Sequence, residues 1–229
     1  MADEEQLIPT PPSKEDILFR DGLPDSWNNA CVNVTWGDDQ HGYTEGYRRG
    51  ARLLVEYVTE QQRDQDYLVY PIIFLYRHHI ELALKNLIRQ APYVIDRPLS
   101  MTETQHLDRH RLDLLWQDFK PMFADVCKAA GWGKLNAADE EGIDNYIRQF
   151  TALDQESFSF RYPRSKKGLP SLPSELRRIN LRHFAELVER LADYLDALDT
   201  AVSVLVEQKA EMEADWRRQE AACYDGDYA

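Results

Sequence analysis

Basic side chains gather in one short window of an otherwise acidic chain. Between residues 161 and 182, a single acidic residue, Glu175, stands among seven basic ones: Arg161, Arg164, Lys166, Lys167, Arg177, Arg178 and Arg182. Where such a window leads into a helix, backbone N–H groups add to the side chains and favour an anionic ligand. The window therefore predicts a phosphate-binding site, with Tyr162 available to stack on a base.

An alternative interpretation pairs these cations with carboxylates, either on the chain itself or on an acidic partner surface. The 229 residues include 27 Lys and Arg against 40 Asp and Glu, which gives a net charge of −13. That charge argues against a protein that coats nucleic acid without selectivity, because the overall field repels phosphates. A local site for RNA, a nucleotide or another anion stays compatible with it.

A second group of charged residues lies in the most apolar part of the chain. Arg77, Glu81 and Lys85 are spaced four apart, which places them along one edge of a helix. This edge is interpreted either as a ladder of ion pairs or as a polar edge that faces a cleft or a subunit interface. In a cleft it would form the polar wall opposite the basic window, together with His110. Charged residues on a central helix need partners under both interpretations.

Other chemistries find no support in the sequence. It has no glycine loop of the G-x-x-x-x-G-K-[ST] or G-x-G-x-x-G type and no G-x-S-x-G motif for a nucleophile. The three cysteines form no Cys-x-x-Cys pair. His106 and His110 are four apart but straddle a loop–helix junction without a pair of carboxylates nearby. We therefore expect no metal and no cofactor.

Helical periodicity predicts the elements that position these residues. Apolar residues recur at spacings of three and four around residues 47–58, 67–90, 110–130, 143–153 and 180–218, and no strand pattern alternates with them. The second of these segments is apolar on almost every side, which is typical of a helix in the middle of a bundle. The expected fold is all-α, a bundle of about five main helices with a long C-terminal helix.

Prolines mark the expected helix boundaries. Pro71 is expected in the first turn of its helix, where its missing N–H costs little, and Pro121 is expected to kink or split the helix that contains it. Residues 91–109 are expected to form a loop. The last helix is expected to begin near Ser174 or Asn180.

Composition along the chain suggests four regions. They are a flexible acidic arm (residues 1–25), an N-terminal helical extension (residues 26–66), the helical bundle (residues 67–206), and a solvated helix end and tail (residues 207–229). The N-terminus lacks the basic start and apolar run of a signal peptide, and the longest apolar stretch, Ile72 to Tyr76, is too short to span a bilayer. A cytoplasmic protein without a membrane segment is the expectation.

Three stretches of the predicted bundle carry a family pattern. Residues 80–88 (IELALKNLI) form an apolar helix with an embedded Glu and Lys, residues 110–116 (HRLDLLW) begin a helix with His-x-Leu, and residues 160–163 (FRYP) place Arg-Tyr-Pro before the closing helix. In this order they resemble the HEPN domain, a helical bundle of prokaryotic toxin, defence and RNA-processing proteins. The resemblance covers residues 67–206 and implies a homodimer formed through helical faces.

The resemblance also implies what a catalytic site would contain. HEPN ribonucleases share an Arg that is followed, after four to six residues, by a His. They need no metal, because the His transfers protons and the Arg stabilises charge on the phosphate. No His follows Arg161 at that spacing, whereas four residues separate Arg178 from His183 and five separate Arg177 from His183. Arg178 and His183 are thus the candidate catalytic pair, and an ordinary solvated or packed helix residue is the alternative for His183.

Three functions stay open on this evidence. The first is a HEPN-like module, an accessory of a toxin–antitoxin or defence system, that binds RNA or a nucleotide through the basic window without catalysis. The second is a metal-independent endoribonuclease that uses Arg178 and His183. The third is a homodimeric interaction scaffold whose C-terminal helix pairs with another chain through residues such as Leu198 and Leu205.

Overall fold

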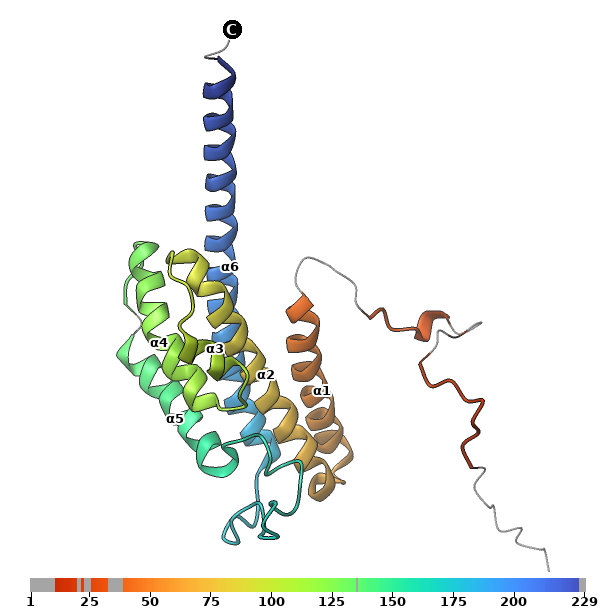
Figure 1. Cartoon of the computed structure of the whole chain (residues 1–229). Coiled ribbons are helices and arrows are strands. Elements are labelled where there is room, and N and C mark those ends of the chain that lie inside the picture. Colours follow the sequence, from red (N-terminus) through yellow and green to blue (C-terminus); the bar gives the residue numbers. More distant parts are fainter. Residues whose placement is uncertain (1–10, 20–21, 23–25, 33–38, 135, 227–229) are drawn as a thin grey trace, which may run out of the picture. The chain divides into compact units, whose positions relative to one another are not determined.

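The computed structural model describes residues 11–19, 22, 26–32, 39–134 and 136–226. This part of the chain contains no strand, and its helices are η1 (Ser26–Asn28, a 3-10 helix), α1 (Asp39–Gln61), α2 (Gln65–Val94), α3 (Met101–Leu107), α4 (Leu112–Ala129), α5 (Ala137–Asp154) and α6 (Leu181–Gly226) (Figure 1). The predicted all-α class with a long C-terminal helix is confirmed. The predicted arm, residues 1–25, lies largely outside the described residues.

Residues Gln40–Ala229 form one compact unit, and Met1–Asp39 form a second. Nearly all of α1 therefore belongs with the bundle, although the sequence pattern sets it apart as an extension. Arg48 of α1 is buried and pairs with Glu189 of α6, 2.5 Å away, and Arg52 pairs with the same carboxylate at 2.6 Å. Tyr76 of α2 is a third donor residue, and its hydroxyl donates to Glu189 at 2.8 Å. Burial opposes ionisation, but these donors hold the pKa of Glu189 at about 2.

Helix α2 supplies the centre of the bundle and packs against α4 and α6. Its buried apolar side chains are Ile72, Ile73, Tyr76, Ile80, Ala83, Leu84, Leu87, Ile88 and Ala91. They face both neighbours, which explains why the sequence of this helix is apolar on almost every side. Each fully buried large aliphatic side chain contributes about 1.5–3 kcal/mol, so α2 is the element that the other helices are built around.

Three prolines lie inside helices: Pro71 and Pro92 in α2 and Pro121 in α4. Helix α2 begins at Gln65, so Pro71 lies beyond its first turn, and Pro121 lies within α4, which continues without a break. Of the kink or split predicted at Pro121, the split is therefore wrong. A proline removes one backbone hydrogen bond, and for Pro71 and Pro121 the carbonyl left free lies four residues earlier, on Tyr67 or Gln117. Both of these residues are exposed, so water can replace the missing donor.

The segment predicted as a loop, residues 91–109, contains the end of α2 and all of α3. Ser100 and Glu103 form a capping box at the start of α3: the Ser100 hydroxyl accepts from the Glu103 N–H (3.2 Å), and the Glu103 carboxylate accepts from the Ser100 N–H (2.6 Å). A helix of seven residues is too short to show apolar periodicity, so this capping box was its only sequence signal. Helix α6 begins immediately after Asn180, which is one of the two starts predicted.

Helix α6 continues past the ends of α2 and α4 (Figure 1). Its first half buries Leu191, Leu195 and Val202, whereas most of its side chains after Val206 are exposed, including Trp216. Charged residues are frequent in this second half. None of the helices described is both long enough and apolar enough to cross a lipid bilayer.

Candidate functional site

The segment between α5 and α6, residues 155–180, is here named the cationic loop. A tight turn forms its tip: the Ser165 N–H donates to the carbonyl four residues later (2.8 Å), and the Gly168 N–H donates back to the Ser165 carbonyl (2.8 Å). Gly168 has a φ of 77°, which residues with a Cβ adopt rarely, and Arg164 donates to its carbonyl at 2.9 Å. Lys166 and Lys167 lie within this turn, and both are exposed.

The basic side chains of residues 161–182 are all exposed. Among the described residues, none of the seven takes part in an ion pair with a carboxylate. Arg161 and Arg164 donate to backbone carbonyls instead, those of Ser157 and Gly168. The interpretation that these cations pair with the chain's own carboxylates therefore finds no support within the part of the chain that the structure describes.

Two open depressions flank Tyr70 of α2, each with a volume of about 510 Å³. Arg177 and Arg178 line the first, Arg161 and Tyr162 line the second, and Tyr70 belongs to both. Tyr70 and Tyr162 are 47% and 50% exposed, so each offers an aromatic side chain beside guanidinium groups. Anionic ligands with flat rings match this combination.

Aromatic rings also fix the position of Arg161. Its guanidinium carbon lies 5.7 Å from the ring centre of Tyr162 and 5.5 Å from that of Phe74 on α2. Phe158 stacks on Tyr162, with ring centres 4.7 Å apart and planes inclined by 28°. These contacts hold a cation at the surface without neutralising its charge, so Arg161 keeps its full charge for a ligand.

A buried charge network connects α2 with the start of the cationic loop; it comprises Arg77, Glu81, Lys85, His110 and Asp154. Lys85 Nζ lies 2.8 Å from Glu81 Oε1, and Arg77 Nη1 lies 3.3 Å from Glu81 Oε2. Arg77 Nε lies 3.6 Å from Asp154 Oδ2. Arg77, Glu81 and Asp154 are at most 2% exposed, so these ion pairs lie in the interior, where an unpaired charge would be very costly.

Arg77 joins the two segments that border the site. Its guanidinium donates to the carbonyls of Asp154 (3.1 Å) and Gln155 (3.3 Å), where the cationic loop begins, and to the carbonyl of His110 (2.6 Å), just before α4. Asp154 in turn accepts from the Phe158 N–H at 2.5 Å. The network therefore holds His110 and the cationic loop at the same end of the bundle.

Charge balance keeps the carboxylate of Glu81 ionised. Burial alone would raise the pKa of Glu81, but hydrogen bonds from Lys85 and His110 hold that pKa below its ordinary value. Burial lowers the pKa of Arg77, and a guanidinium still stays protonated because its ordinary pKa exceeds about 12. Two cations, Arg77 and Lys85, thus balance the two carboxylates of Glu81 and Asp154.

His110 is the member of the network that reaches solvent, since its side chain is 53% exposed. Its Nδ1 lies 2.8 Å from Glu81 Oε1, and the described residues supply no hydrogen bond to Nε2. A buried carboxylate that orients a half-exposed imidazole is the arrangement of an acid–base group, because the imidazole can exchange a proton with a ligand at the surface. Lys85 adds positive charge next to it.

The two residues of the predicted catalytic pair do not line the same depression. Arg178 lines the first depression, whereas His183 lies exposed in the first turn of α6 and lines none of the depressions described. The backbone N–H of His183 donates to the Asn180 side chain (3.0 Å), which caps the helix. The predicted cleft wall also needs correction: Arg77 and Glu81 are buried because their ion pairs close inside the bundle, and of the four predicted wall residues His110 is the most exposed.

Sequence patterns missed Tyr70 and Asp154. They placed His110 in the same polar wall as Glu81 but did not specify the contact between the two. No local signal marks that contact, since 28 residues lie between Glu81 and His110 and only the packing of α4 on α2 joins them. Tyr70 could have been noticed as an aromatic residue in the more polar first turns of an apolar helix. Among the described residues, no group of three or more His, Cys, Asp or Glu side chains is arranged to hold a metal ion.

Comparison with known proteins assigns no family. No protein-family model, curated protein or solved structure matched this chain. The resemblance to HEPN domains therefore stays a prediction based on three short stretches of sequence. The exposed cations, the aromatic rings and the buried charge network are the features of this chain that bear on its function.

Proposed function

We propose that this protein binds single-stranded RNA through its cationic loop. The observation that carries the proposal is a set of exposed cations, unpaired with carboxylates in the described part of the chain, beside the exposed rings of Tyr70 and Tyr162. Phosphates pair with the cations and bases stack on the rings, as in other sites for single strands. The resemblance to HEPN domains supports RNA as the nucleic acid.

The geometry favours several nucleotides over a single phosphate. The two depressions share Tyr70, so arginines follow one another along the surface from Arg161 to Arg177 and Arg178. Lys166 and Lys167 stand at the tip of the turn, where they add charge for a longer strand. Three predictions accompany this proposal. The protein is cytoplasmic, it forms a homodimer through helical faces, and it is an accessory of a toxin–antitoxin or defence system.

Charge reversal at the tip of the loop tests the proposal. The double variant Lys166→Glu/Lys167→Glu is expected to bind a fluorescent 12-nucleotide RNA about tenfold more weakly, because two phosphate contacts become repulsive. Lys128→Glu/Lys134→Glu is the matched control: both lysines are exposed, and the net charge changes equally, but neither belongs to the cationic loop. Anisotropy titrations at one ionic strength measure both affinities, and circular dichroism verifies the folds. Equal losses in the two variants, or no binding by the unmodified protein, would contradict the proposal.

A second candidate function is metal-independent cleavage of the bound RNA. The observation that favours it is the contact between His110 and the buried carboxylate of Glu81, at the same end of the bundle as the cationic loop. In this function His110 transfers a proton at the 2′-hydroxyl or at the leaving oxygen, and Arg161 stabilises the charge that develops on the phosphate.

Cleavage of end-labelled RNA in the presence of a chelator tests this second function. We expect His110→Ala to slow cleavage by a factor of about 100 or more, which is the usual contribution of a positioned acid–base group. His183→Ala is the control, because His183 is also exposed but lies outside the network and the depressions. A loss confined to His183→Ala would instead support the Arg178–His183 pair, and intact RNA with the unmodified protein would leave binding as the function.

A further inference from the structure

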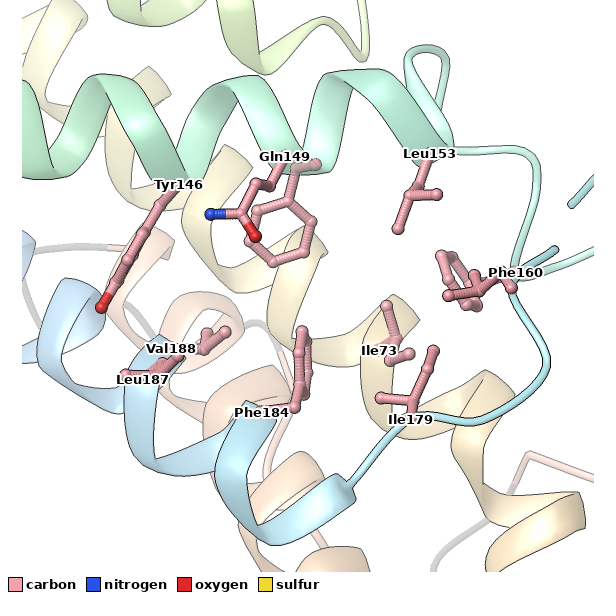
Figure 2. Close-up of a pocket in the computed structure, with 11 residues that line it drawn as sticks. Ile73, Tyr146, Gln149, Leu153, Phe160, Ile179, Phe184, Leu187 and Val188 are labelled. Atoms are coloured by element: carbon pink, nitrogen blue, oxygen red, sulfur yellow. The ribbon is translucent and has the colours of Figure 1, made fainter. Parts of the chain in front are cut away.

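An apolar cavity of about 170 Å³ lies between α5, α6 and the cationic loop, on the inner side of that loop. Figure 2 shows its wall: Ile73 comes from α2, Leu153 from α5, Phe184 and Val188 from α6, and Ile179 from the loop. Phe150 of α5 also lines it. The eleven residues that line it include no charged side chain. An ion would lose its hydration there without gaining a partner, so an uncharged occupant is required.

Polar groups are confined to the rim of this cavity. Tyr146 and Gln149 extend from α5 toward α6 in Figure 2. Gln149 is exposed, and neither its amide nor the Tyr146 hydroxyl has a hydrogen-bond partner among the described residues. The mouth of the cavity thus offers both a donor and an acceptor, while its interior offers only carbon.

We propose that this cavity binds a small uncharged molecule that has an apolar ring and one hydrogen-bonding group, about the size of a monosubstituted benzene. The volume supports this class, because an apolar protein cavity of about 150 Å³ is known to hold benzene. The rings of Phe150 and Phe184 meet edge to face, with centres 6.1 Å apart, and such rings pack well against another aromatic ring. The rim groups select the polar substituent.

An occupant of the cavity would stiffen the cationic loop. Phe160, Leu176 and Ile179 line the cavity and also line the depression that holds Arg177 and Arg178. A ligand therefore contacts the inner face of the same layer of side chains whose outer face carries the arginines. An effect of the cavity ligand on RNA affinity rests on the proposed function. Ligand binding in the cavity and stiffening of the cationic loop do not depend on it.

Benzyl alcohol is the probe for this site, used with the full chain carrying ¹³C-labelled methyl groups. We expect the methyl signals of Ile73 and Ile179 to shift and saturate with a Kd on the order of 1 mM, while Ile88, buried elsewhere on α2, stays in place. Hydrogen exchange of the Leu176 amide, which donates to Pro173, is expected to slow at least twofold. Benzylamine, which is protonated near neutral pH, is expected to bind at least tenfold more weakly. Shifts that never saturate, or that spread evenly over all methyl groups, would overturn the proposal.

Two variants separate this cavity from other surfaces. Leu187→Phe enlarges a half-buried side chain of the wall and is expected to weaken benzyl alcohol binding at least tenfold. Should that variant not fold, Gln149→Glu places a carboxylate at the exposed rim; it is expected to weaken benzyl alcohol at least threefold and to strengthen benzylamine. Gln208→Glu makes the same charge change at an exposed position of α6 and should change neither the benzyl alcohol affinity nor the benzylamine affinity. If Gln149→Glu leaves the affinities for benzyl alcohol and benzylamine unchanged, the proposal is overturned. These titrations contain no RNA, so a failure of the proposed RNA binding would not affect the conclusion about the cavity.

Discussion

Replacing Glu81 by alanine will lower the free energy of unfolding by about 3–5 kcal/mol, the usual cost of leaving a buried charge without its partner. The carboxylate of Glu81 pairs with Arg77 and Lys85 and also contacts the imidazole of His110. Arg77 is 1% exposed and cannot turn to solvent, so its charge would stay in the interior with one carboxylate fewer. Urea unfolding followed by circular dichroism measures the loss.

An exposed ion pair supplies the control for this experiment. Asp215 and Arg218 pair on the surface of α6, with side chains 61% and 76% exposed, and Asp215→Ala is expected to change the unfolding free energy by less than about 1 kcal/mol. Glu81→Gln keeps the shape of the side chain but removes its charge, so its loss should fall between the two. A Glu81→Ala variant as stable as Asp215→Ala would show that the network does not hold the bundle together.

The same carboxylate makes stability depend on pH. The folded-state pKa of Glu81 lies below its ordinary value of 4.5, so the folded protein releases that proton more easily than the unfolded chain. Its contribution is therefore complete above pH 4.5 and is lost as the pH falls through the lower folded-state pKa. Glu189, with a pKa of about 2, acts in the same direction. Acid unfolding of Glu81→Gln should accordingly be less steep than that of the unmodified protein.

Affinity for single-stranded RNA will fall about 100-fold between 50 and 200 mM salt, the loss expected if five cations of the loop contact phosphates. Binding to phosphates releases counterions, and the logarithm of the affinity then falls by about 0.7 per contact for each tenfold rise in salt. The effect should be strong here because the whole chain carries −13, so binding depends on the local charge of the loop. Anisotropy titrations at four or more salt concentrations give the slope.

The lysine variant provides a second readout of the same contacts. In Lys166→Glu/Lys167→Glu, the salt slope should become less steep by about 1.4, because two phosphate contacts are lost. In Lys128→Glu/Lys134→Glu, the slope should stay unchanged, since those lysines lie outside the cationic loop. A slope near zero in the unmodified protein would mean that RNA, if bound, is not held by its phosphates.

Helix positions followed from the sequence where the physical signal was local. The apolar pattern of residues 67–90 predicted the central helix, because a helix that is apolar on all sides must be surrounded by others. Helix α3 was missed for the opposite reason: its seven residues carry a capping box but no periodicity. Pro71 and Pro121 led to wrong predictions for the start of α2 and for the continuity of α4. A single lost backbone hydrogen bond on an exposed surface costs little compared with the packing of a whole helix.

The sequence by itself determined the helical class and the concentration of positive charge in residues 161–182, because periodicity and charge are properties of neighbouring residues. Only the tertiary structure decided which side chains meet: Glu81 with His110, Arg77 with Asp154, and the apolar wall of the cavity beneath the cationic loop. Such contacts join residues far apart along the chain, and they depend on how helices pack rather than on any local pattern.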